Sequence, residues 1–203
     1  EGPNKHSAAI QVGRLHELPE GPDPWVPDGP LYPARLLLVG CWWLTREIEL
    51  GNASTRDVTP CMCGVSWTLP ASKTDIRALG ATRSLKCACG RLPGAPRVMS
   101  EAECPACALL EQKDAAMRHA VRHGQAEVEF PPLFPTAEGA YPTKASVIAT
   151  IRDAARRLGQ PLVSPQGAQL WGGHAMRRGG AQHLASLGID VWKIQSMARH
   201  STS

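Results

Sequence analysis

The stretch Gly172-Gly-His-Ala-Met-Arg-Arg-Gly-Gly-Ala-Gln-His-Leu-Ala-Ser-Leu-Gly188 holds the densest set of chemically capable side chains in the sequence. We predict a helix over residues 174–187, which Gly188 ends, because glycine readily adopts the left-handed conformation that closes helices. His174 and Arg177 are three positions apart, and this spacing puts both side chains on one helix face. A histidine and an arginine are therefore predicted to act at one place.

A second helix is predicted over residues 190–198, with Asp190 as its N-cap, within Ile189-Asp-Val-Trp-Lys-Ile-Gln-Ser-Met-Ala-Arg-His-Ser201. Near the end of that stretch, His200 follows Arg177 by 23 positions. The C-terminal region thus combines a His-x-x-Arg pair on one helix with a further histidine just beyond the next.

An apolar segment upstream also carries an arginine. Residues 33–51 begin with proline and end with glycine, and the segment is predicted to be a buried helix. Arg46 lies on this helix, and the acidic residue Glu49 follows three positions later. The apolar residues that recur at mostly helical spacing are Leu36, Leu37, Val39, Trp43, Leu44, Ile48 and Leu50.

Residues 65–70 and 78–86 flank the polar stretch Ala71-Ser-Lys-Thr-Asp-Ile-Arg77 and predict a β-hairpin with Lys73 at its projecting tip. Two further helices are expected, one from a Ser100-Glu-Ala-Glu103 capping box to near Gly124 and one from Thr143 to Gly159. The predicted fold class is α+β: a mainly helical domain with a small antiparallel sheet at residues 61–89.

Taken in their order along the chain, these segments resemble the catalytic domain of the tyrosine recombinase (phage integrase) family. His174 and Arg177 match the family's His-x-x-Arg motif, and His200 falls where the family places its last His or Trp. The segment Trp43-Leu-Thr-Arg-Glu-Ile-Glu-Leu50 is similar to the family's first arginine helix, with Arg46 as the catalytic arginine and Glu49 as the supporting acid.

The hairpin adds to the resemblance. Leu69-Pro-Ala-Ser-Lys-Thr-Asp75 is similar to the family's hairpin tip, on which Lys73 would be the catalytic lysine. The resemblance covers about residues 33–203. It implies DNA strand cleavage and rejoining through a 3′-phosphotyrosine intermediate, as in the site-specific recombination and integration carried out by mobile elements.

The residue types suit that chemistry. A phosphodiester under attack spreads negative charge over its oxygens, and fixed positive donors stabilise that charge. By resemblance, Arg46 and Arg177 clamp the scissile phosphate, since the arginine guanidinium is a planar, permanently charged fork of donors. His174 and His200 would donate hydrogen bonds or move protons, and Lys73 would protonate the departing 5′ oxygen. No cofactor is implied for catalysis.

The nucleophile expected from the resemblance is not in the sequence. The family's tyrosine follows the last His or Trp by a short stretch, but this chain ends at Ser203. Tyr32 and Tyr141 are its two tyrosines, and neither follows His200. We expect a C-terminally incomplete domain that is inactive alone, with the nucleophile outside the chain. The alternative is a catalytically silent DNA-binding or zinc-stabilised interaction module on the same fold.

Six of the seven cysteines fall into three pairs, Cys61-Met-Cys63, Cys87-Ala-Cys89 and Cys104-Pro-Ala-Cys107. A hairpin whose turn is centred on Asp75 would bring the first two pairs together at its base. The third pair, at the start of the following helix, could complete a structural zinc site. Buried free thiols are the equally weighted alternative.

Residues 1–33 are dense in proline and glycine, which predicts an arm or linker, with residues 34–203 forming the catalytic domain. A formal net charge of +4 fits a polyanionic partner without requiring one. Cysteines without a secretory signal, and no apolar run of bilayer length, predict an intracellular protein away from membranes. The resemblance implies double-stranded DNA as partner, a homo-oligomer on it, and a nuclear location in a eukaryote.

Each site residue has a structural alternative when taken singly. Arg46 could form a surface ion pair with Glu49, the histidines could be ordinary core or surface residues, and Lys73 a solvated loop residue. The ordered set favours the catalytic interpretation. A solvated basic face is likewise the default for the remaining basic residues of the central region, Arg77, Arg83, Lys86, Arg91 and Arg97.

Overall fold

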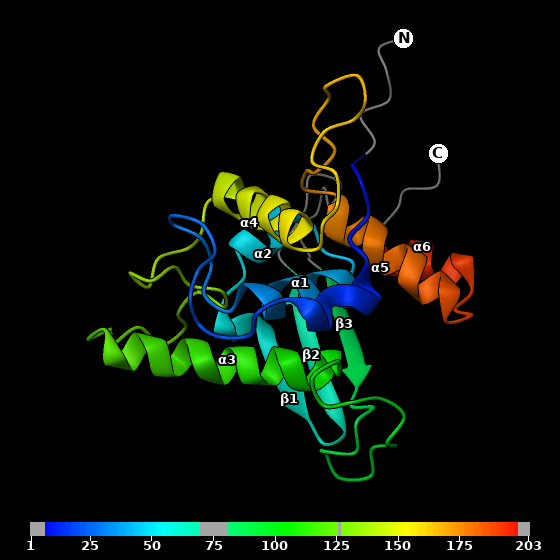
Figure 1. The fold of residues 1–203 in the computed structure, drawn as a ribbon. Helices are drawn as coiled ribbons and strands as arrows, with labels where there is room; N and C mark the ends of the chain where they lie inside the picture. The colour runs from blue at the N-terminus through cyan, green and yellow to red at the C-terminus, as the bar shows by residue number, and fades with distance from the viewer. Residues whose placement is uncertain (1–6, 70–80, 126, 199–203) are drawn as a thin grey trace.

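The computed structural model describes residues 7–69, 81–125 and 127–198, which are built around a central helix (Figure 1). This helix, α1 (Pro33–Trp42), contacts α3, α4 and α5 and the short 3₁₀ helix η1. Leu36, Leu37 and Val39 on α1 are fully buried. The helix is apolar on nearly every side, which is why it can form the middle of the core rather than a surface layer.

The single helix predicted over residues 33–51 is wrong, because the structure breaks it into α1 and α2 (Glu47–Gly51). Leu44, between them, has a left-handed backbone with φ of 51°. Its side chain packs with Leu184 and Ile194 of the C-terminal helices, and the Thr45 amide and hydroxyl both donate to the Gly40 carbonyl. Tertiary packing of Leu44 and the local Thr45 hydrogen bonds therefore hold the chain out of the helix.

The predicted antiparallel sheet is confirmed. Strands β2 (Gly64–Leu69) and β3 (Ala81–Lys86) pair from Gly64 with Lys86 to Leu69 with Ala81, the register expected for a turn centred on Asp75. A strand that the sequence pattern missed, β1 (Val58–Cys61), follows the 3₁₀ turn η2 (Thr55–Asp57) and pairs with the other side of β2. Helix α3 (Pro105–Arg122) packs against all three strands.

The remaining helices lie close to the predicted bounds. They are α4 (Lys144–Arg157), α5 (Ala175–Ser186) and α6 (Val191–Ala198). Thr143 caps α4 by accepting the Ser146 amide, and Gly159 and Gly188 follow α4 and α5 with φ of 66° and 80°. The capping box predicted at Ser100 does not start α3, because the Ser100 hydroxyl bonds the Glu103 carboxylate and Cys104 is the N-cap.

Helices α1 and α5 pack at very short range. A Cβ added to Gly180 would lie 1.8 Å from the Cys41 carbonyl oxygen, and one added to Gly40 would lie 2.5 Å from the Met176 sulfur. At Gly180 the neighbour is backbone, so only glycine fits there, whereas a side chain at Gly40 would have to displace the Met176 side chain. This close approach brings the N-terminal turns of α5 up to the end of α1, where the candidate site lies.

The N-terminal segment is tied to this pair of helices. Ile10, Val12, Leu15 and Leu18, in and around η1 (Val12–Glu17), are buried, and η1 contacts both α1 and α5. The Ile10 amide donates to the Ala175 carbonyl at 3.3 Å. Part of the stretch predicted as an arm or linker thus contributes to the core. None of the helices that the structure describes has the length and apolar character needed to cross a membrane.

Candidate functional site

The C-terminal end of α1 accepts two guanidinium groups from distant elements. Arg177 on α5 donates through Nε to the Leu44 carbonyl at 2.7 Å, and Arg83 on β3 donates to the Trp43 carbonyl. The last carbonyls of a helix lack intrahelical partners and carry the negative end of the helix dipole, so cations are favoured there. The left-handed turn at Leu44 gives two consecutive carbonyls two different arginine partners.

Arg177 also forms a buried ion pair. Its Nη2 lies 2.9 Å from Oε2 of Glu49 on α2, and the two side chains are 5% and 3% exposed. The same Glu49 oxygen accepts the backbone amide of Arg46 at 2.7 Å. One carboxylate oxygen therefore links the two arginines that the sequence singled out, because it holds the guanidinium of Arg177 and the backbone of Arg46.

Arg46 begins α2 as its N-cap residue, with an extended backbone. Its side chain is half-buried, and its Nε has no hydrogen-bond partner within the described parts of the chain. The surface ion pair considered for Arg46 is not what residues 7–69, 81–125 and 127–198 show, since Glu49 pairs with Arg177 instead. Among the described residues, the Arg46 guanidinium therefore has fewer hydrogen bonds than the Arg177 guanidinium.

His174 is the exposed N-cap residue of α5, one turn before Arg177. The preceding Gly173 lies against α2, and a Cβ there would lie 1.9 Å from the Glu47 carboxyl carbon. A side chain at position 173 would therefore have to displace the Glu47 carboxylate, which lies against the start of α5. The elements that carry Arg46, His174 and Arg177 are neighbours, as the predicted common site requires.

Two predicted site residues, Lys73 and His200, lie outside the described residues. Conversely, Arg83 was expected to be solvated, and the structure instead directs it to the end of α1. It stands opposite Trp67 on β2, whose ring meets that of Trp43 edge-on at 5.6 Å. A strand arginine facing a buried tryptophan was the signal that could have identified it.

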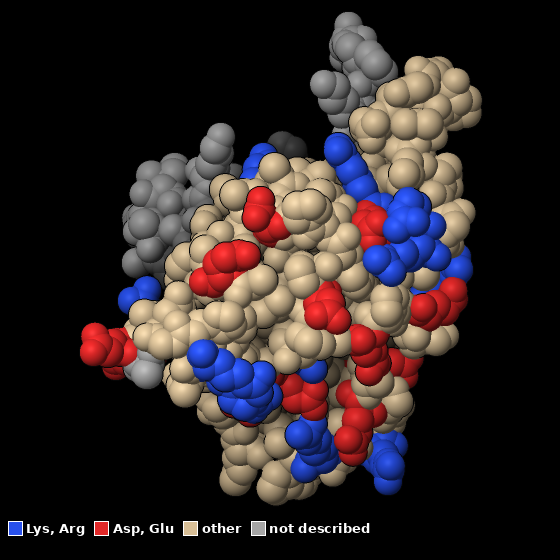
Figure 2. Space-filling model, turned by 60° about the vertical axis from the view of Figure 1, so that its left-hand side comes forward, with Lys and Arg blue, Asp and Glu red and all other residues tan. Residues whose placement is uncertain are grey.

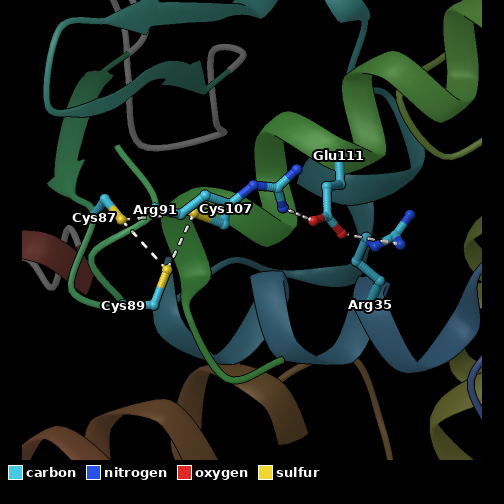
Figure 3. A network of polar contacts seen from close by, with 6 residues as sticks. All are labelled: Arg35, Cys87, Cys89, Arg91, Cys107 and Glu111. Carbon is cyan, nitrogen blue, oxygen red and sulfur yellow. Dashed lines mark hydrogen bonds and ion pairs between the residues drawn. The ribbon is translucent and has the colours of Figure 1, made fainter. Parts of the chain in front are cut away.

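Four of the six paired cysteines form one buried group, Cys87, Cys89, Cys104 and Cys107, whose sulfur atoms all lie within 4.8 Å of one another. Figure 3 shows three of these sulfurs beside the Arg91–Glu111–Arg35 ion pairs. Donor type and count fit a metal ion such as zinc.

Cys61 and Cys63, predicted as further ligands, do not belong to this group. The hairpin register does place the Cys63 carbonyl opposite the Cys87 amide, at 2.8 Å. However, the chain reverses between Cys61 and Gly64, so that Cys61 pairs within β1 and β2 and its side chain is exposed, while Cys63 is half-buried.

The grouped thiols shift one another's pKa values. Burial alone would raise the pKa of Cys87, but hydrogen bonds from the Leu92 and Cys89 amides and from neighbouring thiols lower that pKa to about 6. Burial raises the pKa values of Cys89 and Cys107. The group thus favours a thiolate at Cys87 that the other sulfurs surround.

The positive charge of the protein is not gathered on the face seen in Figure 2, where basic and acidic side chains are interspersed. Several of the basic residues are paired with acids, for example Arg156 and Arg157 with Asp153 on α4. On that face the net charge alone does not mark a nucleic-acid surface.

Neither a protein-family model nor a curated protein matches the sequence. Among solved structures, the crystal structure of XerH site-specific recombinase bound to difH substrate, a pre-cleavage complex, is similar, with a TM-score of 0.60 and 12% sequence identity. The match covers 98% of this chain and 48% of that chain, so this chain spans about half the length of the recombinase. The chain has a tyrosine-recombinase-like α+β fold.

Proposed function

We propose that this chain supplies the phosphate-binding part of a domain that cleaves and rejoins DNA strands through a 3′-phosphotyrosine intermediate. The observation that carries the proposal is that one oxygen of Glu49 on α2 holds both the backbone amide of Arg46 and the guanidinium of Arg177, which comes from α5. The fold that the chain shares with a recombinase bound to its DNA substrate adds support.

The proposed reaction needs a tyrosine from outside these 203 residues, in which no tyrosine follows His200. The tyrosine hydroxyl gives its proton to His174 or His200 as its oxygen attacks phosphorus, the phosphotyrosine bond forms and the bond to the 5′ oxygen breaks. Lys73 gives that oxygen its proton, and Arg46, Arg177 and the two histidines neutralise the charge on the phosphate. Rejoining reverses these steps, so the phosphodiester bond energy is conserved.

Glu49 has a positioning role in this proposal. Its carboxylate fixes the Arg177 guanidinium and the Arg46 backbone before any phosphate arrives. Donors that are already placed need little reorganisation when charge develops. The half-buried Arg46 guanidinium is the group expected to contact phosphate most directly.

The first test measures DNA binding. The 203-residue chain should bind duplex DNA weakly, with an affinity that falls steeply as salt rises, because phosphate contacts release counterions. Arg46→Ala should weaken binding and reduce the slope of log affinity against log salt by about 0.9, the value of one phosphate contact. Arg118→Ala, an exposed arginine on α3, is the matched control and should change neither quantity beyond the loss of one remote charge.

The second test looks for the covalent intermediate. A nicked suicide DNA substrate is incubated with the 203-residue chain and with a chain extended along its own reading frame, and products are separated on a denaturing gel. We expect an adduct only from an extended chain that contains a tyrosine, and none after Arg46→Ala. An adduct from the shorter chain would place the nucleophile at Tyr32 or Tyr141 and overturn the proposal.

One observation favours a second candidate, a catalytically silent DNA-binding or interaction module. Arg177 is only 4% exposed and bonds both the Leu44 carbonyl and Glu49, a role that stabilises the fold without any phosphate. An extended, tyrosine-containing chain that binds DNA yet never forms an adduct would select this module.

A further inference from the structure

The junction between β3 and α3 holds four buried cysteines whose geometry fits a single tetrahedral ion. Zinc–sulfur bonds of about 2.3 Å place the four sulfurs of a tetrahedral site about 3.8 Å apart. The sulfur separations here are 3.4 Å for Cys87–Cys89, 3.6 Å for Cys87–Cys107 and 3.5 Å for Cys89–Cys107, and Cys104 lies within the same group. We propose that Cys87, Cys89, Cys104 and Cys107 bind one structural zinc ion.

The backbone around the first two ligands keeps their sulfurs together. Cys87 and Cys89 are two positions apart, and their sulfurs lie 3.4 Å from each other. Gly90, directly after Cys89, has a φ of 76°, a left-handed conformation that favours glycine. Cys89 pairs with Arg97 in an isolated bridge, so the chain turns back beside these ligands.

The other two ligands lie at the start of a long helix. Cys104 is the N-cap of α3 and Cys107 lies in its first turn, with Pro105 as the first helical residue. The positive end of the helix dipole and the unpaired first amides stabilise thiolates at this place. A Cys-x-x-Cys pair at a helix start can therefore supply two ligands to one ion.

Charged groups near the site offset part of its charge. Zinc with four thiolates carries two net negative charges, which are unfavourable in a buried site unless positive groups lie nearby. Arg91, two residues after Cys89, pairs with Glu111, which lies one turn beyond Cys107 on α3 (Figure 3). Arg35 on α1 pairs with the other Glu111 oxygen at 3.4 Å. Two arginines thus share one acid beside the cluster.

The ion would fasten a connection that has little structure of its own. Between β3 and α3 the chain forms neither a helix nor a strand. It has an isolated bridge, Cys89 with Arg97, the Val98 and Met99 amides bonded to the Ala88 carbonyl, and two local turns, from Ala95 to Leu92 and from Cys104 to Glu101. Joining both ends of this connection through one ion fixes the end of β3 to α3. The base of the β2–β3 hairpin is thereby held against the core.

The experiment uses the whole chain, purified under reducing conditions with zinc present. Elemental analysis and native mass spectrometry should find one zinc per chain, and titration of the metal-free protein with Co²⁺ should give the charge-transfer and d–d absorption of a tetrahedral thiolate site. Cys107→Ser and Cys89→Ser should each lose most of the bound zinc. Cys61→Ser, at the end of β1, and Cys63→Ser, in the turn before β2, are the matched controls and should retain it.

Three outcomes would overturn the proposal. They are substoichiometric zinc in the reduced wild-type protein, iron in place of zinc, and zinc loss in the Cys61→Ser or Cys63→Ser variant equal to that in Cys107→Ser. The wild-type metal content and Co²⁺ spectrum need no ligand variant to fold, so a ligand variant that fails to fold still leaves a decisive result. Hydrogen exchange at the Val98 and Met99 amides should speed up when a chelator removes the metal.

Discussion

The backbone of Gly180 lies so close to Cys41 that a Cβ on Gly180 would stand 1.8 Å from the Cys41 carbonyl oxygen. The carbonyl belongs to α1 and the glycine to α5, so this contact sets the distance between the two helices that build the candidate site. A side chain at position 180 would have to push the helices apart. The position of Arg177, one turn earlier on α5, depends on that separation.

Gly180→Ala should therefore destabilise the protein, even though alanine is the better helix former. We expect the free energy of unfolding to fall by about 1–3 kcal/mol, the usual range for overpacking. Urea denaturation followed by circular dichroism measures it. Gly13→Ala in η1 is the control, because a Cβ there meets nothing within 4 Å. Equal stability of the Gly180→Ala and wild-type proteins would contradict the packing argument.

Removing the acid of the buried ion pair should be strongly destabilising. In Glu49→Gln, Arg177 keeps its charge at 4% exposure but loses the negative charge of its Glu49 partner. Breaking a buried pair from one side typically costs about 3–5 kcal/mol. Glu17→Gln, which breaks the exposed Arg14–Glu17 pair, should change the free energy of unfolding by no more than about 1 kcal/mol. Similar losses in both variants would argue against a special role for Glu49.

Arg83→Ala should loosen the hairpin from the end of α1. The variant leaves the Trp43 carbonyl without its guanidinium donor, and hydrogen bonds to charged groups contribute about 1.5–3 kcal/mol. Hydrogen exchange should show faster exchange of β3 amides with little change in α4. Arg152→Ala, which removes a bond to the Trp171 carbonyl, should leave the strand amides as they are. Uniform acceleration over the whole chain would indicate general destabilisation instead.

Acid should weaken the fold through His183. Burial lowers the pKa of His183, whose ring meets that of Trp42 edge-on at 5.1 Å. The unfolded chain then takes up this proton more readily than the folded chain, so stability is full above the ordinary histidine pKa and falls as pH drops below it. The free energy of unfolding should be measured between about pH 7.5 and about pH 5.5, an interval that brackets the ordinary histidine pKa. Over this interval it should fall less in His183→Gln than in wild type. His119, whose pKa is also lowered by burial, accounts for part of the remaining loss.

Local patterns predicted the helix bounds well. Helix α4 begins after Thr143 and ends before Gly159 because capping and termination depend on neighbours in sequence. The break at Leu44 could not be seen this way, since its cause is packing against Leu184 and Ile194 on later helices. Periodicity continued through the break and so predicted one helix where there are two.

The candidate site was predictable only in part for the same reason. The spacing of His174 and Arg177 is local, and the structure keeps them on consecutive turns. The bond from Arg83 to Trp43 joins residues 40 positions apart, and its one indirect signal is the pairing of Arg83 with Trp67 across the hairpin. For the cysteines, the hairpin register was right, but the extra strand β1 turned Cys61 away from the group.

Glu49 and Arg177 are 128 positions apart, and this separation has a consequence for how the domain is made. At roughly 5–20 residues per second, a ribosome takes about 6–26 s to add the arginine after the glutamate. During that time Glu49 lacks its Arg177 partner, so burying the Glu49 carboxylate in the fold would be unfavourable. We therefore expect α1 to α4 to remain loosely packed and accessible to chaperones on the ribosome until α5 emerges and completes the core.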